Sequence, residues 1–514
     1  MEGRHTGWET TPVGLQSFGR IAASVFPVIV IVQLCSFGAS LALASVLGAS
    51  SATDAYFLGL SVPLVVFGTM LAAVRLGAIP ALTEAQRLGP ERFSISASEL
   101  LTAVLVASAG LVTLAALVNV LALPLFVSDN DGQTLPLARL MTVELAPLGF
   151  LGAGSGALGA ILTVRGHFVA PVAVLCFDPI LRALLVITAG SLLGVQALVA
   201  GQLAGNLLAI CLLWQLVRRA GVDLRLVPFS RSRFVVGVLA FSAPLLIGQS
   251  VLQVNPVIDR TMAAALPPSN VTVLDLAVGM FSVPVALLAS TLIAPIAATW
   301  ASRYAEEGWP ALKQSYARAV RGLLVALPPI VILGFLLRRE VLTITYEWGA
   351  FSKSAADRTA VVFGMLLLGL PAQTLVIFLS TLFVVRRDSI FPMKIALANV
   401  CLNVALNFAL RPFLGVAGLA LSTTLTYTIL CSVYAAVARR RFGPLGLGLL
   451  RAEVAMVLVA SGLVALTAGS LLALLPHAET KTQALFNIFA VSGLGIAIYF
   501  GPLALQRLKT RSQS

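Results

Sequence analysis

Charged residues are scarce in this 514-residue chain: they make up 11% of it, against roughly 25% in a typical soluble domain. The three histidines, His5, His167 and His477, form no cluster, and the five cysteines lie inside apolar stretches without metal-ligand or redox spacing. The sequence also lacks a nucleotide-binding loop, a nucleophile elbow and paired catalytic carboxylates. We therefore expect no disulfide framework, no zinc site, no ATP-driven step and no enzyme.

Long apolar runs fill most of the chain instead, which is 59% hydrophobic. Runs of about 20 residues or more are long enough to cross a ~30 Å hydrocarbon core. The N-terminus, Met1 to Arg20, is too polar to be a cleavable signal peptide. The sequence predicts an all-α, polytopic membrane protein with about 14 transmembrane helices, near residues 21–47, 55–82, 99–126, 138–163, 169–193, 195–217, 234–265, 272–299, 316–338, 358–385, 390–410, 414–438, 452–475 and 483–503.

Basic residues are unevenly divided between the two sides that these spans define. If the N-terminus is cytoplasmic, 23 Lys and Arg residues fall in cytoplasmic segments, seven fall outside and four lie within spans. Because cytoplasmic loops of membrane proteins are enriched in Lys and Arg, both termini are predicted to be cytoplasmic. The net charge of +13 is then a topology signal. We expect contact with anionic membrane lipids and none with nucleic acid.

One segment of the chain repeats at a constant offset. "ATDAYFLGLSVPL" begins at position 52 and "VLDLAVGMFSVPV" begins at position 273. Residues that set turns, kinks and topology recur with the same spacing of 221 positions (275 − 54). The pairs are Asp54 and Asp275, Pro63 and Pro284, Arg165 and Arg386, Gly194-Val195 and Gly415-Val416, and Arg218-Arg219 and Arg439-Arg440. The pattern indicates an old internal duplication.

The repeat predicts the division of the chain into parts. A cytoplasmic N-terminus (1–20) precedes a six-helix lobe (21–220), and a second six-helix lobe (234–440) follows. Two additional transmembrane helices (452–503) and a cytoplasmic tail (504–514) complete the chain. Because six is even, both lobes enter the membrane from the same side. Parallel repeats of this kind are typical of transporters that rock one bundle against the other.

Ionisable residues inside the spans need a partner or a role, because a charge at bilayer depth costs about 2.5–3.5 kcal/mol on insertion scales. Asp178 and Arg182 stand at i and i+4 on one helix and form either a structural ion pair or an arginine that Asp178 orients toward a cavity. Asp259 and Arg260 follow Pro256 and point about 100° apart, so they cannot form one pair. That span is either a gating or ion-binding helix, or its charges extend to the interface.

Three further charged residues lie near span ends. Arg75, at the inner end of the second span, either extends its charge to the interface or serves the function. Asp54 and Asp275 open their helices and are expected to cap free N–H groups. In the fourth span, Gly152 and Gly156 are four residues apart and predict a close helix–helix contact.

An asparagine ladder runs along the eleventh span. Asn399, Asn403 and Asn407 recur every four residues, about 6 Å apart on one face. The next span adds hydroxyl groups, including Ser422 and Thr423. Amides in lipid must bond to neighbouring helices or to an ion, so the ladder is either interhelical glue or part of a Na⁺ site balanced by one carboxylate.

Several stretches resemble a known family. "GASSATDAYFLGLSVP", "REVLTITYEWGAFSKSAADRTA", "LGLPAQTL" and "FPMKIALANVCLNVALNFALRPFLGVAGLALSTTL" are similar to the MurJ/MviN-type lipid II flippases. These belong to the multidrug/oligosaccharidyl-lipid/polysaccharide exporter superfamily, and the resemblance covers roughly residues 20–450. It implies that an undecaprenyl-pyrophosphate-linked saccharide, a lipid II-like peptidoglycan precursor, crosses the inner membrane by alternating access.

The resemblance also implies binding residues. Some members hold Na⁺ with an aspartate of the seventh helix, two polar residues of the eleventh and a threonine of the twelfth. The matching positions here are Asp259, Asn403, Asn407 and Thr423; Asn407 replaces a residue that is acidic in some relatives.

The family also carries headgroup-binding arginines in its first, second and eighth helices, and of these helices only the second has one here, Arg75. A pyrophosphate needs cations in a dry cavity, so Arg75, Arg182 and Arg260 are the candidate substrate-binding residues.

Other functions compatible with the sequence are a flippase for another polyprenyl-linked glycan such as an exopolysaccharide unit, a cation-coupled small-molecule antiporter, and a non-transporting membrane scaffold. No cofactor is expected beyond a coupling Na⁺ or H⁺. The expected partners are the lipid-linked saccharide, membrane lipids and the cell-wall synthesis machinery.

Overall fold

The computed structural model describes residues 15–127, 132–225, 227–228, 232–288, 294–386, 388, 390–443, 445, 451–476, 478 and 480–511. Within these residues every regular element is a helix, and thirteen helices are long and apolar enough to cross a membrane. They correspond to thirteen of the fourteen predicted spans. The remaining one, predicted at 234–265, is helix α9 (Arg233–Ala264), whose side chains at 239–252 lie outside the description. The all-α, polytopic fold class is thereby confirmed.

The helices of the first half, which we call the N-lobe, pack around α2 and the α7–α8 pair. Helix α2 contacts α3, α4 and α5, while α1 contacts α7. The elements are α1 (Leu15–Leu47), α2 (Ser51–Arg87), α3 (Pro90–Phe126), α4 (Thr134–Leu145), α5 (Pro147–Val164), α6 (Ala170–Ala173), the 3₁₀ turn η1 (Val174–Cys176), α7 (Phe177–Leu193) and α8 (Gln196–Arg219).

The helices that follow, which we call the C-lobe, pack around α13, which contacts α10, α11 and α15. Helices α14 and α15 form a pair, as α7 and α8 do in the N-lobe. Long α11 is interrupted by non-helical backbone at Gly308, where φ is 74°, just before Pro310. Besides α9, the elements are α10 (Asn270–Leu288), α11 (Ala294–Leu336), α12 (Arg338–Thr345), α13 (Lys353–Val385), α14 (Ile390–Leu414) and α15 (Val416–Phe442).

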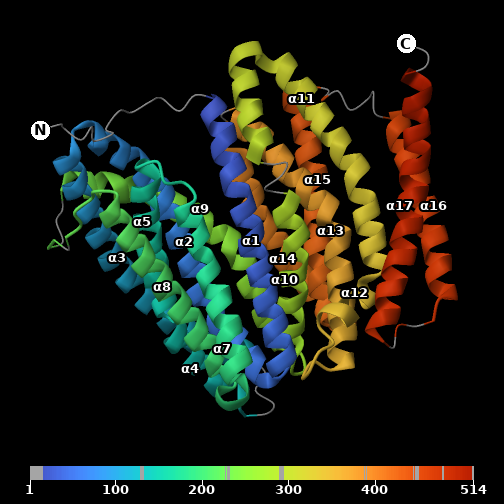
Figure 1. Ribbon diagram of the computed structural model, residues 1–514, viewed down its shortest axis with the longest axis horizontal. Coiled ribbons are helices and arrows are strands. Elements are labelled where there is room, and N and C mark those ends of the chain that lie inside the picture. Colours follow the sequence, from blue (N-terminus) through green and yellow to red (C-terminus); the bar gives the residue numbers. More distant parts are fainter. Residues whose placement is uncertain are drawn as a thin grey trace, which may run out of the picture.

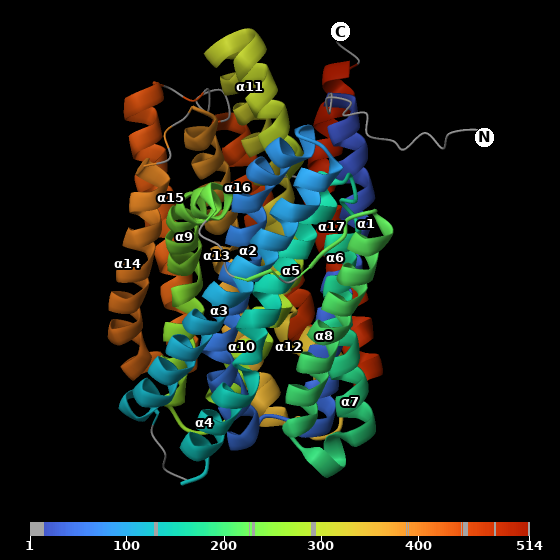
Figure 2. The same ribbon diagram turned by 90° about the vertical axis from the view of Figure 1, so that its left-hand side faces the viewer.

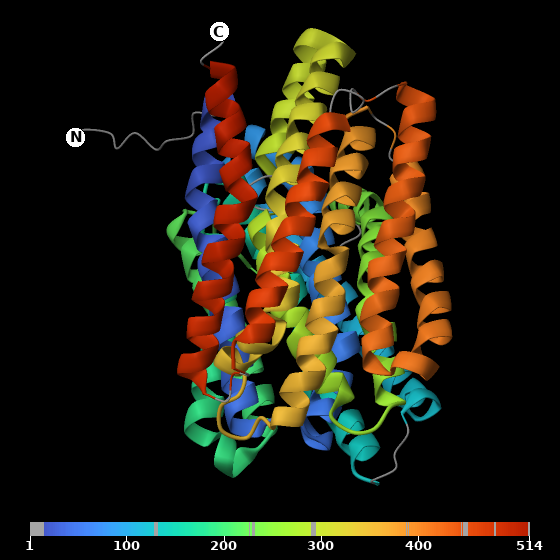
Figure 3. The same cartoon turned by 90° about the vertical axis from the view of Figure 1, so that its right-hand side faces the viewer.

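Two more helices, α16 (Arg451–Leu474) and α17 (Lys481–Arg511), stand at one edge of the bundle. They pack on each other and against α11 and α12. In Figure 3 the pair lies in front, nearest the viewer. A small separate core joins them to α11, with Val464, Val491 and Tyr499 buried against Leu333 and Leu337. Among the described residues, this core joins the pair to the C-lobe.

The lobes meet along α1 and α2 on one side and α9 and α10 on the other. The beginning of α1 and the end of α17 lie at the same end of the bundle, the upper end in Figure 1. An even number of membrane crossings requires this arrangement. We call the opposite end, which carries the α1–α2 turn, the outer end, following the orientation predicted from the basic residues.

Small residues let α5 approach α2 closely, as predicted. A Cβ atom at Gly152 would lie 2.7 Å from the carbonyl oxygen of Phe67, and one at Gly156 would lie 3.1 Å from that of Leu71. Larger side chains would force the two helices apart. The two glycines therefore set the distance between α5 and α2, and α2 is also the helix of the N-lobe that contacts α9 of the C-lobe.

Candidate functional site

The outer half of α9 and the facing sides of α14 and α15 carry a connected set of polar side chains. The Asn407 amide donates to Asp259 Oδ1 at 2.6 Å and to Asn403 Oδ1 at 3.1 Å. Asn403 in turn donates to the Thr423 hydroxyl at 3.2 Å, and Ser422 donates to Asn407 Oδ1. Both asparagines are almost completely buried. The structure thus brings the four predicted cation-binding residues into one chain of hydrogen bonds.

The third member of the asparagine ladder points to a different helix. Asn255 on α9 donates to Asn399 Oδ1 at 2.5 Å. Oxygen-bearing side chains of the ladder nevertheless open onto a cavity of about 290 Å³ inside the C-lobe, whose lining includes Asn399, Asn403, Asp259 and Thr423. We call this space the C-lobe cavity. The ladder therefore joins helices and lines a cavity at the same time.

An arginine and a second aspartate line the same cavity. Arg260 Nε lies 3.0 and 2.9 Å from the two carboxylate oxygens of Asp275, and Nη2 lies 2.5 Å from Oδ1. Both side chains are nearly buried, at 12% and 11% exposure. As predicted, Asp259 and Arg260 take different partners. Because Asp275 neutralises Arg260, Asp259 remains the cavity's one carboxylate without a cationic partner among the described residues.

The expected role of Asp275 as a helix cap is wrong. Helix α10 begins at Asn270, so Asp275 lies beyond its first turn, where every N–H group already has a partner within the helix. The carboxylate is instead committed to Arg260 on the neighbouring α9. The sequence did not show this because the two residues lie on different helices.

Asp54 does cap N–H groups, but those of another helix. Its carboxylate accepts from the backbone N–H groups of Ser269 and Thr272, each at 2.7 Å, and from the Thr272 hydroxyl at 2.6 Å. Its own helix, α2, is capped by Ser50. Asp54 therefore ties the N-lobe to the first turn of α10 at the outer end.

A second contact closes the outer end beside Asp54. The backbone N–H of Ala350 donates to the carbonyl of Ser45 at 2.8 Å. A Cβ at Gly349 would lie 2.1 Å from that carbonyl oxygen, and one at Gly48 would lie 2.5 Å from the carbonyl oxygen of Ala350. Both glycines have positive φ, 58° and 65°. The two lobes thus touch backbone to backbone at this end.

Asp178 and Arg182 face each other on α7, with Arg182 Nε 3.9 Å from Asp178 Oδ1. Arg182 also contacts the hydroxyl of Tyr56, which donates to Gln202 Oε1 at 2.5 Å. Tyr56 is fully buried, and Arg182 Nε is a buried atom without a hydrogen-bond partner in the described part of the chain. The pair is therefore neutral, but the arginine keeps an unused donor.

Glycines hold α8 against this ion pair. A Cβ at Gly201 would lie 2.5 Å from the Cα of Arg182, and one at Gly205 would lie 2.4 Å from the Cα of Asp178. Contacts this short exclude every other residue unless the helices separate. The α7–α8 spacing that positions the arginine is thus set by two residues of α8.

Arg75 stands apart from the other two candidate arginines. It lies on α2, 14 residues beyond Ser61 (75 − 61), which Arg260 approaches at 3.5 Å. At 1.5 Å per residue this places Arg75 about 21 Å nearer the inner end. Its side chain is half-buried, and no ion pair among the described residues includes it. The structure does not gather the three arginines in one place.

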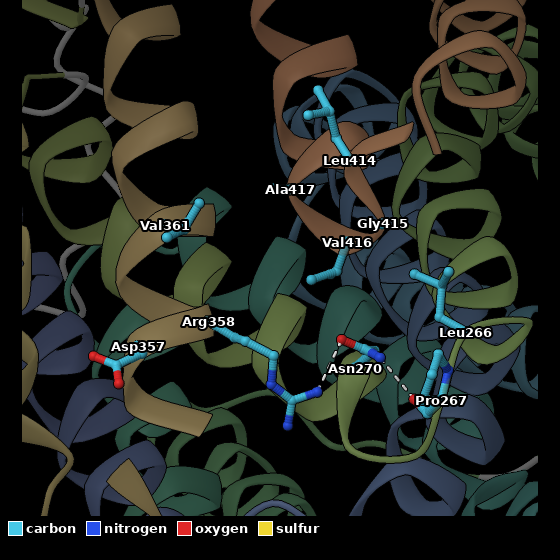
Figure 4. Close-up of a pocket in the computed structure, with 10 residues that line it drawn as sticks. All are labelled: Leu266, Pro267, Asn270, Asp357, Arg358, Val361, Leu414, Gly415, Val416 and Ala417. Carbon is cyan, nitrogen blue, oxygen red and sulfur yellow. Dashed lines mark hydrogen bonds between the residues drawn. The ribbon is translucent and has the colours of Figure 1, made fainter. Parts of the chain in front are cut away.

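Another cavity, of about 470 Å³, opens at the outer end of the C-lobe, where the α9–α10 turn meets α13 and the α14–α15 turn (Figure 4). Arg358 donates to Asn270 Oδ1 at 3.2 Å, and Asn270 donates to the Pro267 carbonyl at 2.7 Å. Asp357, at the rim, pairs with Arg339. These contacts stabilise the turn beside Asp54, and sequence reasoning assigned them no role.

Sequence reasoning also missed Tyr56 and Gln202. For Gln202 the constant offset of the repeat was a usable signal, because Asp178, Arg182 and Gln202 lie 221 positions before Asn399, Asn403 and Thr423 (399 − 178; 403 − 182; 423 − 202). Tyr56 had no such signal, because the position 221 residues later is Ala277. Two members of the candidate cation site, Asn403 and Thr423, thus have their repeat counterparts, Arg182 and Gln202, in the N-lobe polar cluster.

Two lobes of membrane-spanning helices that meet along α1, α2, α9 and α10 define a polytopic membrane protein of two-lobe architecture. The solved structure titled "Lipid II flippase MurJ, inward closed conformation" has this fold, with a TM-score of 0.77 at 17% identity, covering 94% of this chain and 99% of that one. An inward-facing multidrug resistance MATE family transporter of the MOP superfamily gives a TM-score of 0.66 at 16% identity, covering 83% of this chain and 98% of that one.

The sequence comparisons give the family. The family model described as lipid II flippase MurJ matches residues 43–492. The chain therefore belongs to the MurJ family, which confirms the resemblance seen in its sequence. "Probable lipid II flippase MurJ" of Helicobacter pylori J99 is 29% identical over 36% of this chain, and that of Rhizobium meliloti 1021 is 25% identical over 57%. The matched segments span 40% and 55% of those relatives.

Proposed function

We propose that this protein moves lipid II, a saccharide linked to undecaprenyl pyrophosphate, across the bacterial inner membrane. The family match over residues 43–492 carries the proposal. The geometry supports it, because the two lobes are joined at the outer end, Arg260 lies at their interface beside Ser61, and a polar cavity opens inside the C-lobe. Alternating access needs such a breakable closure at one end.

Complementation tests the proposal. A cell whose own lipid II flippase is depleted should grow when this chain is expressed, and lipid II should become accessible to an external reagent. If growth fails although the protein reaches the membrane, a flippase for another polyprenyl-linked glycan becomes the leading function. A deficit in an exported glycan, restored by this chain, would then identify that substrate class.

The pyrophosphate headgroup is proposed to bind Arg182 and Arg260. Both arginines lie near the outer half of α2: Arg182 contacts the Tyr56 hydroxyl, and Arg260 approaches Ser61 and the ring of Phe57. In this structure each also faces an aspartate, Asp178 or Asp275. A pyrophosphate offers more acceptor oxygens than a carboxylate, so it can replace these partners without leaving a buried cation unpaired. Arg75, which lies nearer the inner end and has no carboxylate partner among the described residues, is the proposed first contact for substrate from the cytoplasm.

A coupling cation is proposed to bind in the C-lobe cavity. Asp259 supplies the negative charge and Asn403 and Thr423 supply neutral oxygens at the cavity, while the Asn407 amide positions Asp259 and Asn403 from behind. Amide, hydroxyl and carboxylate oxygens are the ligands that hard cations prefer. Since Arg260 and Asp275 neutralise each other, one Na⁺ would balance the charge of Asp259. H⁺ on Asp259 is the alternative, and a response to pH without a response to Na⁺ would favour it.

We propose that both termini face the cytoplasm. A cysteine introduced in the 218–233 segment should be protected from an impermeant thiol reagent in intact cells, whereas one introduced at Ser269 should react when the outer end opens. The reverse labelling pattern would invert every inside and outside assignment. An association with the cell-wall synthesis machinery follows from the proposed substrate and stays a prediction.

A further inference from the structure

A crevice of about 710 Å³ opens between the lobes in the outer half of the bundle. One wall is formed by α2 and α3 of the N-lobe, and the other by α9 and α14 of the C-lobe. In Figure 2, α14 and α9 stand at the left, and α3 runs obliquely so that its lower part approaches them. Lining residues at its mouth are strongly exposed: Val118 at 55%, Leu125 at 78% and Phe408 at 63%. In a membrane these side chains face lipid.

The lining is apolar with three polar exceptions: Asn119, Thr261 and Arg411. Asn119 donates to the Thr142 hydroxyl at 2.9 Å, and Thr261 donates to the Ile258 carbonyl at 2.8 Å. These two are satisfied within the protein. The third exception, the arginine, is the one charged residue in the lining.

Arg411 has little to bind within the protein. Its Nη1 lies 3.5 Å from the carbonyl oxygen of Met262, and no carboxylate in the described ranges lies within ion-pair distance. It stands three residues before the outer end of α14, which ends at Leu414, or about 4.5 Å along the helix axis. Arg139, which donates to the Val120 carbonyl at 3.3 Å, adds a second cation beside the lining residues of α3.

Arg411 places a positive charge near the membrane surface, and the crevice beside it is apolar. This combination of charge and apolar surface fits one class of ligand. An amphiphile with an anionic phosphate and hydrocarbon chains would place its phosphate at Arg411 and a chain between the lobes. Anionic glycerophospholipids meet the crevice from the membrane itself. The C-lobe cavity does not share this chemistry, because its arginine is already neutralised by Asp275.

We propose that the crevice between α2–α3 and α9–α14 binds an anionic glycerophospholipid of the outer leaflet, with its phosphate on Arg411. The bound lipid contacts both lobes, so it stabilises the arrangement in which the outer end is closed. By mass action, any ligand that prefers one arrangement shifts the population toward it. This inference does not depend on which substrate the protein carries.

Lipid binding by the purified full-length protein tests the proposal. Native mass spectrometry with added phosphatidylglycerol or phosphatidylcholine should show a retained phosphatidylglycerol that Arg411→Gln binds about ten- to hundred-fold more weakly, which is the effect of losing one charged hydrogen bond. Lys353→Gln is the matched control, since Lys353 is an exposed basic residue of α13 outside the crevice, and it should bind as the wild type does. Ala122→Trp, which fills the crevice from α3, should also displace the lipid while leaving Arg411 in place.

Three results would overturn the proposal. Equal binding by wild type and Arg411→Gln would show that the arginine holds no phosphate. Equal retention of phosphatidylcholine and phosphatidylglycerol would show that charge is not recognised. A co-purified polyprenyl lipid in the crevice, displaced by Ala122→Trp, would identify the substrate's tail as the occupant.

Discussion

The two lobes place polar clusters at equivalent positions of the repeat and use them differently. On α7 and α8 of the N-lobe the residues are Asp178, Arg182 and Gln202; 221 positions later, on α14 and α15, they are Asn399, Asn403 and Thr423. The turns between these helices are alike, because Gly194 has φ 58° and ψ −135° and Gly415 has φ 56° and ψ −134°. The same backbone thus carries two different charge patterns.

The difference concerns where the positive charge comes from. In the N-lobe the arginine is a permanent cation, held beside Asp178 by the chain itself. In the C-lobe neutral amides stand at those positions, and Asp259 adds a carboxylate from α9. A fixed guanidinium cannot dissociate, whereas an oxygen-lined cavity can take up and release an ion. Under the proposed function, ion coupling therefore belongs to the C-lobe and the N-lobe needs none.

The repeated aspartates give the largest expected contrast between the lobes. Asp275→Asn leaves Arg260 buried without a counter-ion and should lower the free energy of unfolding by about 3–5 kcal/mol. Asp54→Asn, at the matched position, removes charge from hydrogen bonds to N–H groups and should cost about 1.5–3 kcal/mol. Chemical denaturation in detergent measures both. Replacing Arg260 and Asp275 together by leucine should recover most of the loss, and equal losses for the two single variants would contradict the assigned pairing.

The second largest contrast is expected in the stabilisation by Na⁺, which should depend on the C-lobe site and not on the N-lobe cluster. At a Na⁺ concentration of 100 times Kd, the wild type should gain about 2.7 kcal/mol of stability. Asp259→Asn removes the carboxylate of the proposed site and should abolish that gain. Asp178→Asn, in the N-lobe cluster, should leave the Na⁺-dependent gain in melting temperature intact. If the wild type melts at the same temperature in Na⁺ and in a large organic cation, the asparagine ladder binds no Na⁺ and only joins the helices by hydrogen bonds.

Substrate binding should depend on the N-lobe arginine. Arg182→Ala should weaken binding of the lipid-linked saccharide by about ten- to hundred-fold, since hydrogen bonds to charged groups contribute about 1.5–3 kcal/mol. Transport in vesicles and binding to the purified protein are the measurements, with expression as a check on folding. The double variant Asp178→Ala, Arg182→Ala is the control: if it regains full transport, the pair is purely structural and Arg182 contacts no substrate.

The smallest contrast is expected between substitutions that change the spacing of the paired helices, α7–α8 in the N-lobe and α14–α15 in the C-lobe. Gly205→Ala places a Cβ against the backbone of Asp178 and should cost about 1–3 kcal/mol through overpacking. The matched position in the C-lobe, 221 residues later, is Thr426, whose buried hydroxyl has no hydrogen-bond partner among the described residues. Thr426→Ala should therefore change stability little or raise it slightly. Thermal unfolding of the two variants compares them; a larger loss for Thr426→Ala would mean that α14 and α15 pack as tightly as α7 and α8.

Much of the molecule was predictable because its causes are local. Each span must satisfy its own backbone hydrogen bonds and match the bilayer thickness, so length and hydropathy located the helices. The i, i+4 spacing placed Asp178 near Arg182, and likewise aligned the asparagines on one face of α14. The resemblance to the family supplied the set Asp259, Asn403, Asn407 and Thr423, but left open whether those residues meet.

Only the tertiary structure decided which faces meet. The partner of Arg260 is Asp275 across two helices, and the carboxylate of Asp54 crosses from α2 to the start of α10. Likewise, the crevice beside Arg411 exists only because four helices from both lobes diverge there. Whether a span is helical depends on its own residues. Which helices pack together depends on shape and polar contacts summed over the whole bundle. The same apolar spans are therefore compatible with many helix pairings, and only the complete bundle selects one.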